Sequence, residues 1–164
     1  MTGGPKAWRP IAGLMALALV GLCGEPARAA ALLDVTGDWP VHIQASDLAN
    51  WQLPSIYESG SSQTWATVSK LPGGHPDWSI DVSRDNIGWP AALQLWVRRT
   101  GDGLGPGAVS GGLAYQVITT SSTAFFSGAL ARSNIPMQWQ LTGVSLSVPS
   151  GTYATTVTFT LTNK

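Results

Sequence analysis

Apolar and polar residues alternate with a period of two along most of the chain. In the clearest run, 153–161, Tyr153, Val157 and Leu161 share one face and threonines dominate the other. The same alternation predicts strands over 41–46, 78–83, 93–98, 113–118, 137–142 and 144–148, and weaker ones over 50–57, 63–69 and 122–127. No helical stripe of apolar residues follows residue 30, apart from one short turn of helix expected at 47–50. The pattern therefore predicts an all-β chain.

Glycine and proline clusters separate the expected strands, as they do in sandwiches and barrels. One face of each strand is polar, so each sheet should have one wet side and one buried side. This favours two antiparallel sheets packed face to face, an immunoglobulin-like β-sandwich, over a barrel around a ligand cavity. In 113–118, Leu113, Tyr115 and Val117 alternate with Ala114, Gln116 and Ile118, so the second face is less polar here than in the other expected strands. The long glycine-rich stretch 101–112 is expected to be an exposed and mobile loop.

The first thirty residues are organised like a secretory signal peptide. A basic start precedes the apolar stretch 11–24, and small residues occupy the −3 and −1 positions of a cleavage site after Ala29. Ala30 and Ala31 offer neighbouring cleavage positions. The alternative, a retained membrane anchor, is disfavoured because a span needs about 20 apolar residues. We expect 1–29 to be a signal peptide and 30–164 to be one exported domain, secreted or held at a bacterial cell surface.

The chain has one cysteine, Cys23, within the apolar stretch. A lipoprotein signal would be cleaved directly before it, but Leu22 stands where such a site needs a small residue. If cleavage follows Ala29, the mature chain has no cysteine. A disulfide, a thiolate nucleophile and a cysteine-ligated metal would then be excluded.

Charge and composition exclude two further classes of protein. The chain has 9 basic and 9 acidic residues, and only 11% of its residues are charged. A nucleic-acid-binding protein would need a basic face to neutralise phosphates, so no nucleic-acid partner is expected. The apolar content of 44% is too high for a disordered chain.

The C-terminal segment adds a resemblance. Residues 148–162 read Val-Pro-Ser-Gly-Thr-Tyr followed by a threonine-rich strand, and Trp139-Gln140-Leu141 fits a Trp-x-Leu pattern. The segment resembles the last strand of the spore-coat-U and fimbrial subunits, and also the ending of the WxL cell-wall domains. The resemblance implies an exported immunoglobulin-like sandwich with a structural or adhesive role on a bacterial surface.

Candidate catalytic and metal sites are weak. His42 and His75 lie outside any motif and are interpreted as solvated residues. The stretch 107–112 places a serine among glycines but lacks the strand–elbow–helix context of a hydrolase nucleophile. The stretch 81–86 has oxygen donors at alternate positions, yet it lacks the glycine and the final glutamate of a calcium loop. We therefore expect no enzyme, metal or cofactor; a glycosidase, which needs two facing carboxylates, is a distant third hypothesis.

Tryptophan is the one enriched residue type with functional interest, at 8 in the chain. Trp78 and Trp139 share faces with aliphatic residues and should be core. The candidate binding residues are Trp89 in a Gly-Trp-Pro turn, Trp96 on the polar face of its strand, and its neighbour Arg98. Exposed aromatic rings stack on sugars or anchor protein partners. The alternatives are a second buried layer, or a cover of arginine over Trp96 through a cation–π contact.

Two hypotheses about function follow. The first is a structural or adhesive surface protein, a fibre or coat subunit, whose partners are other copies of itself or other surface proteins. Its strand donor would be the segment 30–43, which carries Leu32, Leu33 and Val35 before Trp39. The alternative is a carbohydrate-binding module that holds a polysaccharide through exposed tryptophans. Neither hypothesis includes a membrane span in the mature form.

Overall fold

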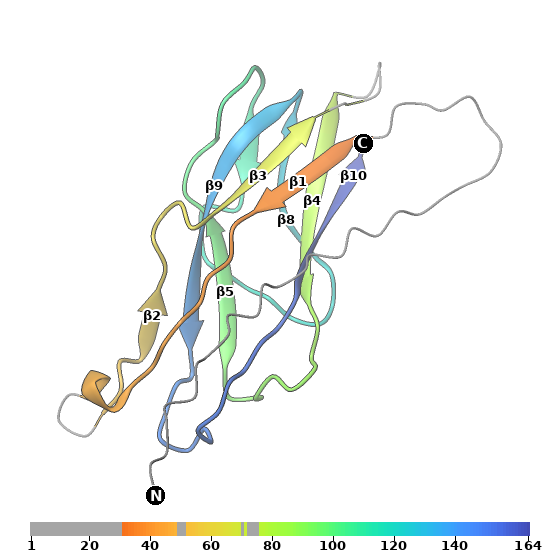
Figure 1. Ribbon diagram of the computed structural model, residues 1–164. Coiled ribbons are helices and arrows are strands. Elements are labelled where there is room, and N and C mark those ends of the chain that lie inside the picture. Colours follow the sequence, from red (N-terminus) through yellow and green to blue (C-terminus); the bar gives the residue numbers. More distant parts are fainter. Residues whose placement is uncertain (1–30, 49–51, 70, 72–75) are drawn as a thin grey trace, which may run out of the picture.

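The structure is a computed structural model that describes residues 31–48, 52–69, 71 and 76–164 (Figure 1). The described chain is built of antiparallel strands and one 3-10 turn, η1 (Ala45–Asp47). The strands are β1 (Leu32–Thr36), β2 (Ile56–Glu58), β3 (Thr64–Ser69), β4 (Asp77–Arg84), β5 (Gln94–Arg99), β6 (Val109–Gly111), β7 (Gln116–Val117), β8 (Thr123–Ala129), β9 (Arg132–Thr142) and β10 (Val157–Asn163). The expected all-β class is confirmed.

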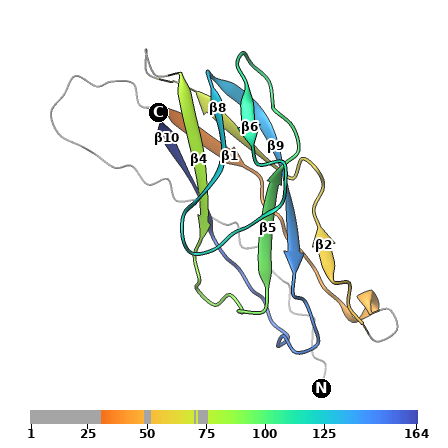
Figure 2. The ribbon, with the colours of Figure 1, turned by 180° about the vertical axis from the view of Figure 1, so that it is seen from behind.

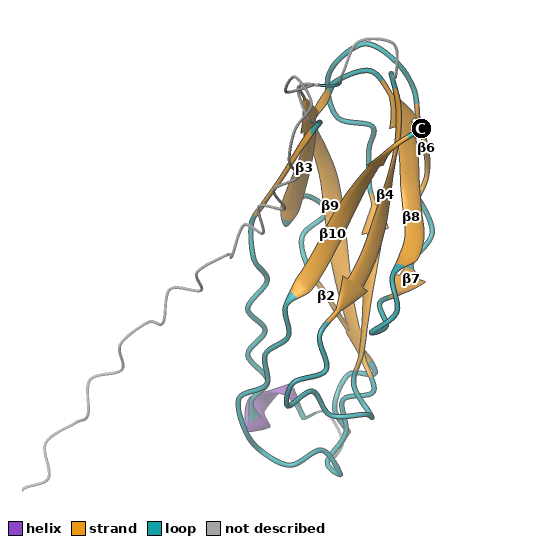
Figure 3. Ribbon diagram, turned by 90° about the vertical axis from the view of Figure 1, so that its right-hand side faces the viewer, coloured by secondary structure: helices purple, strands orange, loops and turns teal. Residues whose placement is uncertain are grey.

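The strands form two antiparallel sheets. Sheet 1 has the order β1-β3-β9-β5-β7, and β2 pairs with β9 beyond the end of β3. Sheet 2 has the order β10-β4-β8-β6. Figure 2 shows β4, β8 and β6 of sheet 2 from behind, and Figure 3, turned by 90°, shows β3 and β9 of sheet 1 beside β4, β8 and β6 of sheet 2. Consecutive strands often lie in different sheets, as in the passages from β3 to β4 and from β9 to β10.

One hydrophobic core fills the space between the sheets. Sheet 2 contributes Trp78, Ile80 and Val82, which are completely buried, and sheet 1 contributes the inward residues of β9 and β5. The ring of Trp139 on sheet 1 lies 6.2 Å from that of Phe159 on sheet 2, edge to face. The prediction that Trp78 and Trp139 are core residues is confirmed.

Strand prediction succeeded where the alternation meets a buried sheet. The predicted strands at 78–83, 93–98 and 137–142 correspond to β4, β5 and β9, with their apolar residues inward. The weaker predictions at 63–69 and 122–127 correspond to β3 and β8. Of the predicted strand at 50–57, only the end lies in a strand, β2; residues 50 and 51 lie outside the described part.

The predicted strand over 41–46 is wrong. This segment is a loop that ends in η1. The carboxylate of Asp47 accepts a hydrogen bond from the amide of Gln44 at 2.9 Å, and the amide of Asp47 donates to the carbonyl of Gln44 at 3.0 Å. A side chain that binds the backbone three residues away favours a turn over a strand.

The predicted strand over 144–148 is also wrong. Gly143 follows β9 with a φ of +81°, and the amide of Val148 donates to the carbonyl of Ser145 at 3.1 Å. The chain therefore turns, and Leu146 is 70% exposed. The run 153–161 forms a strand only from Val157 onward, although its apolar residues do lie on the inner side.

Of the predicted strand over 113–118, only Gln116 and Val117 form a strand, β7. Leu113 is 60% exposed, whereas Ile118, assigned to the other face, is 1% exposed. Gly111 and Gly112 both have positive φ, at +83° and +71°, which redirects the chain before β7. The amide of Ile118 then donates to the carbonyl of Leu95 at 2.8 Å, which fixes the buried side chain.

The stretch 101–112 is largely exposed, as expected, but hydrogen bonds tie it to β5 and β9. Its end forms β6, and Leu104 exchanges backbone hydrogen bonds with Ser133 at 2.7 and 2.8 Å. The buried guanidinium of Arg132 donates to four carbonyl groups of the loop, those of Asp102, Gly103, Gly105 and Gly107. Arg99, 2% exposed, binds the carbonyls of Gly101 and Gly111 and pairs with Asp102. We call this arrangement the arginine-held loop.

Several sequence predictions concern residues outside the described part. These are the signal peptide 1–29 with its cleavage position, Cys23, and His75. Within the described residues, no helix is long and apolar enough to span a membrane.

Candidate functional site

The candidate site is the outer side of sheet 1, where the non-core residues of β5 and β9 lie. Trp96 and Arg98 alternate with the buried Leu95 and Val97, so both project away from the core. Register places Trp96 beside Gln140 and Arg98 beside Gln138 on β9. We call this surface the sheet-1 outer face.

Arg98 is the centre of a hydrogen-bonded group on this face. Its Nε and Nη2 atoms donate to Oε1 of Gln138 at 3.0 and 2.7 Å, and the Gln138 amide donates to the carbonyl of Ser59 at 2.9 Å. The guanidinium also lies 4.7 Å from the centre of the Tyr115 ring, a cation–π distance. Arg98 therefore covers Tyr115, and not Trp96 as one alternative from the sequence proposed.

The pKa of the Tyr115 phenol is raised by its surroundings. Burial raises the pKa of its phenol, and the neighbouring carboxylate of Glu58 raises it further, while Arg98 acts in the opposite direction. Tyr115 therefore remains a neutral phenol at physiological pH, and its buried hydroxyl has no hydrogen-bond partner among the described residues. The face presents uncharged donors and acceptors beside one arginine and one glutamate.

Trp96 is half-buried, and its indole N–H donates to the hydroxyl of Thr142 at 3.0 Å. This bond holds the ring against the sheet and leaves its π-face as the group that a ligand could contact. The ring is therefore oriented before any ligand arrives, which lowers the entropy cost of binding.

A second tryptophan on this face was not singled out from the sequence. Trp65 on β3 is 39% exposed and lies opposite Pro136 of β9. Its neighbours Thr64, Ala66 and Val68 are buried. The alternation in 64–68 was the signal that could have identified it, because a tryptophan out of phase with buried neighbours must point outward.

The structure does not bring Trp89 to this face. Trp89 packs against the core from the loop between β4 and β5, and its indole N–H donates to the carbonyl of Leu93 at 2.8 Å. The guanidinium of Arg84 covers its ring at 5.4 Å. Trp89 thus lies on the core side of sheet 1, and Trp96 lies on the outer side.

The three proposed donor residues lie in β1, an edge strand of sheet 1. β1 pairs antiparallel with β3, so that Leu33 faces Val68 and Val35 faces Ala66. Leu33 and Val35 pack against the core, while Leu32 is 41% exposed on the other side. The β1 side chains therefore complete the core from its edge.

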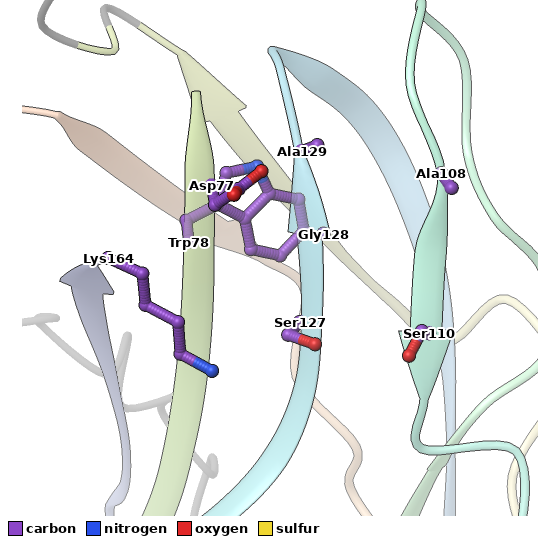
Figure 4. Close-up of a pocket in the computed structure, with 8 residues that line it drawn as sticks. All are labelled: Asp77, Trp78, Ala108, Ser110, Ser127, Gly128, Ala129 and Lys164. Carbon is purple, nitrogen blue, oxygen red and sulfur yellow. The ribbon is translucent and has the colours of Figure 1, made fainter. Parts of the chain in front are cut away.

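A hollow of about 310 Å³ lies on sheet 2 (Figure 4). Its lining combines the ends of β4, β8 and β10 with β6, and consists of Asp77, Trp78, Ala108, Ser110, Ser127, Gly128, Ala129 and Lys164. Small residues make up most of the lining, and Trp78, which also lines the hollow, is itself completely buried. Ser110, the serine of the glycine-rich stretch, is exposed here.

The remaining sequence candidates have separate locations. His42 is exposed in the loop after β1. Asp85 of the calcium-like stretch accepts hydrogen bonds from the hydroxyl of Thr155 at 2.9 Å and from the amide of Thr156 at 3.2 Å; these bonds lower its pKa. In the part of the chain that the structure describes, no three His, Cys, Asp or Glu residues gather as metal ligands would.

Comparison of the chain with protein-family models, with curated proteins and with solved structures finds no match. The functional argument therefore depends on the described geometry and on the sequence.

Proposed function

We propose that the chain is an exported, non-enzymatic structural or adhesive surface protein with an immunoglobulin-like sandwich, and that its copies assemble through exchange of β1. The observation that supports this most is the position of β1. It is the first described strand, it lies at a sheet edge, and it inserts Leu33 and Val35 into the core. The sequence pattern of 1–29 supports export, and the threonine-rich ending supports a surface role.

Exchange of β1 requires that the strand can leave its own sheet and that a connecting segment is long enough to reach another copy. β1 lies at the edge of sheet 1 (Figure 1), and the stretch from β1 to β2 contains η1 as its described element. A β1 strand that leaves its own β3 and pairs with β3 of another copy makes the same contacts there. Such an exchange changes little in contact energy and links copies head to tail.

The test compares assembly of the protein with that of a locked variant. Leu33→Cys with Val68→Cys places cysteines at a facing pair, where a disulfide ties β1 to its own β3. In a Cys23→Ser background we expect sedimentation to show polymers for the parent and none for the oxidised locked variant, with assembly restored on reduction.

Deletion of 30–36 should likewise stop assembly. Leu32→Ser, on the exposed side of β1, is the matched control and should leave it intact. A parent protein that stays a monodisperse monomer at high concentration contradicts the proposal. Polymers of the oxidised locked variant contradict it as well.

A carbohydrate-binding module is the second candidate, and the pair Trp65 and Trp96 favours it. Both project from the sheet-1 outer face, opposite Pro136 and Gln140 of the intervening β9. A separation of four residues along the strand and two strand spacings across it places them about 16 Å apart. Indole faces stack on sugar rings, and the amide of Gln140, on the strand between them, offers hydrogen bonds to hydroxyls.

Retention on insoluble polysaccharides tests this candidate. Trp65→Ala and Trp96→Ala should each weaken retention by about tenfold, as the loss of an aromatic anchor does. Trp89→Phe, on the core side of sheet 1, is the control and should bind like the parent. A parent protein that no polysaccharide retains would eliminate this candidate.

A further inference from the structure

The four edges of the two sheets are protected unequally. β6 and β7 are short, with 3 and 2 residues, and β1 carries Asp34. β10 has 7 residues with the sequence Val-Thr-Phe-Thr-Leu-Thr-Asn, without a charge, a proline, a glycine or a bulge. Natural edge strands usually carry at least one of these protective features, because a bare edge pairs with other strands. Figure 3 shows β10 as the outermost strand on one side of sheet 2.

The direction of the free backbone groups of β10 follows from its hydrogen bonds to β4. Asp85 donates to the carbonyl of Thr156 at 3.0 Å, and Lys164 donates to the carbonyl of Asp77 at 2.9 Å. In an antiparallel ladder, residues with bonds to the partner alternate with residues whose bonds point away. The N–H and C=O groups of Val157, Phe159, Leu161 and Asn163 therefore point to the open edge. None of them makes a backbone hydrogen bond outside the strand ladders among the described residues.

The apolar side chains of β10 are also incompletely buried at this open edge. Val157, Phe159 and Leu161 pack against the core but are only half-buried, because sheet 2 ends beside them. The start of the strand is held in place by the hydrogen bonds of Asp85 to Thr155 and Thr156. The edge is thus straight, fixed and partly apolar, and its free backbone groups specify a β-strand as the partner.

A second copy of β10 fits this edge in one symmetric register. When two β10 strands run antiparallel about a two-fold axis at Thr160, Val157 faces Asn163 of the other copy and Phe159 faces Leu161. All four outward residues then exchange hydrogen bonds, about eight in total. On the outer face Thr160 lies opposite Thr160, and Thr158 lies opposite Thr162. No like charges meet, because the strand is uncharged.

We propose that β10 is a self-pairing edge, through which two copies join their four-stranded sheets into one continuous sheet. The pairing covers the half-buried Phe159 and Leu161 of each copy with those of the other. It is isologous and closes as a dimer. It does not depend on export or on exchange of β1.

Paired charges test the register. In Thr158→Lys with Thr162→Lys, two lysine pairs face each other across the axis, so we expect the dimer to dissociate at a concentration at least about tenfold higher. Thr158→Lys with Thr162→Glu is the matched variant, because its lysine faces a glutamate, and it should dimerise like the parent. Both variants change exposed side chains opposite Ser83 and Ser79 of β4, so circular dichroism should report the same fold. The oxidised, locked β1 background keeps polymers out of the sedimentation measurement.

A cysteine at the axis provides a second measurement. In a Cys23→Ser background, Thr160→Cys should form a covalent dimer on mild oxidation, because facing residues of a pair without hydrogen bonds lie about 4.5 Å apart. Thr156→Cys, which lies off the axis, should remain monomeric under the same conditions.

The outcomes separate this proposal from the proposed function. A locked-background parent that is monomeric at high concentration, or a Lys/Lys variant that dimerises as well as the Lys/Glu variant, overturns β10 pairing. Neither result bears on exchange of β1, which the polymer measurement decides. Dimers that persist after the locking disulfide forms, and dissociate with the Lys/Lys change, support β10 pairing alone.

Discussion

The packing of Trp78 depends on a neighbouring glycine, Gly128. Its ring is completely buried, and its indole N–H donates to the carbonyl of Leu130 at 2.8 Å. Gly128 on the neighbouring β8 faces Trp78 in the register. A Cβ atom at position 128 would lie 2.5 Å from Cζ2 of Trp78 and 2.9 Å from the carbonyl oxygen of Ala108. Both neighbours are fixed, so neither can move aside without loss of packing or hydrogen bonding.

Gly128→Ala should therefore destabilise the fold by about 1–3 kcal/mol, the cost of overpacking a filled core. Gly60→Ala is the matched control, since the nearest atom to its added Cβ is 4.0 Å away and its φ is not positive. Urea denaturation followed by tryptophan fluorescence would compare the two variants. Equal midpoints for Gly128→Ala and Gly60→Ala would contradict this account of Trp78.

At the scale of elements, the arginine-held loop shows how a glycine-rich segment becomes ordered. Gly103, Gly105 and Gly107 all have positive φ, and a Cβ at each would lie within 2.6 Å of a backbone oxygen. The loop therefore approaches the start of β9 more closely than other residues would allow. Arg132 then donates partly buried hydrogen bonds to carbonyl groups of the loop.

Arg132→Met should release this loop. The variant leaves several partly buried carbonyls without a donor, which predicts a loss of about 1–3 kcal/mol in the free energy of unfolding. Arg98→Met, on the sheet-1 outer face, leaves one acceptor atom, Oε1 of Gln138, and should cost less, about 1 kcal/mol. Hydrogen exchange at the amides of Leu104 and Ser133 should accelerate in Arg132→Met alone. Unchanged exchange at these amides would show that Arg132 does not hold the loop.

The same elements show which features sequence patterns can predict. Strands β4, β5 and β9 were predictable because one face of each is buried, and burial imposes the alternation. The run 41–46 alternates as regularly, yet the side chain of Asp47 turns the backbone locally. The arginine-held loop could not be predicted, since it depends on Arg132 meeting a segment about thirty residues earlier. The outward orientation of Trp65 could have been predicted from the alternation, whereas the position of Trp89 follows only from the three-dimensional fold.

At the scale of the whole molecule, the order of strands decides which surfaces are open. The sequence indicated two sheets with one polar side each, but alternation contains no information about which strand lies at an edge. The two long edge strands, β1 and β10, come from opposite ends of the described chain and lie near each other (Figure 1). β1 exchange and β10 pairing would thus use one side of the molecule, and together they would cross-link linear assemblies in pairs.

The central position of β9 has a consequence for the way the chain is made. β9 pairs with β2, β3 and β5, so sheet 1 cannot close before residues 132–142 have left the ribosome. Most of the polypeptide must therefore wait, without stable tertiary structure, for a partner encoded near its end. A nascent chain in this condition remains accessible to chaperones until β9 has emerged.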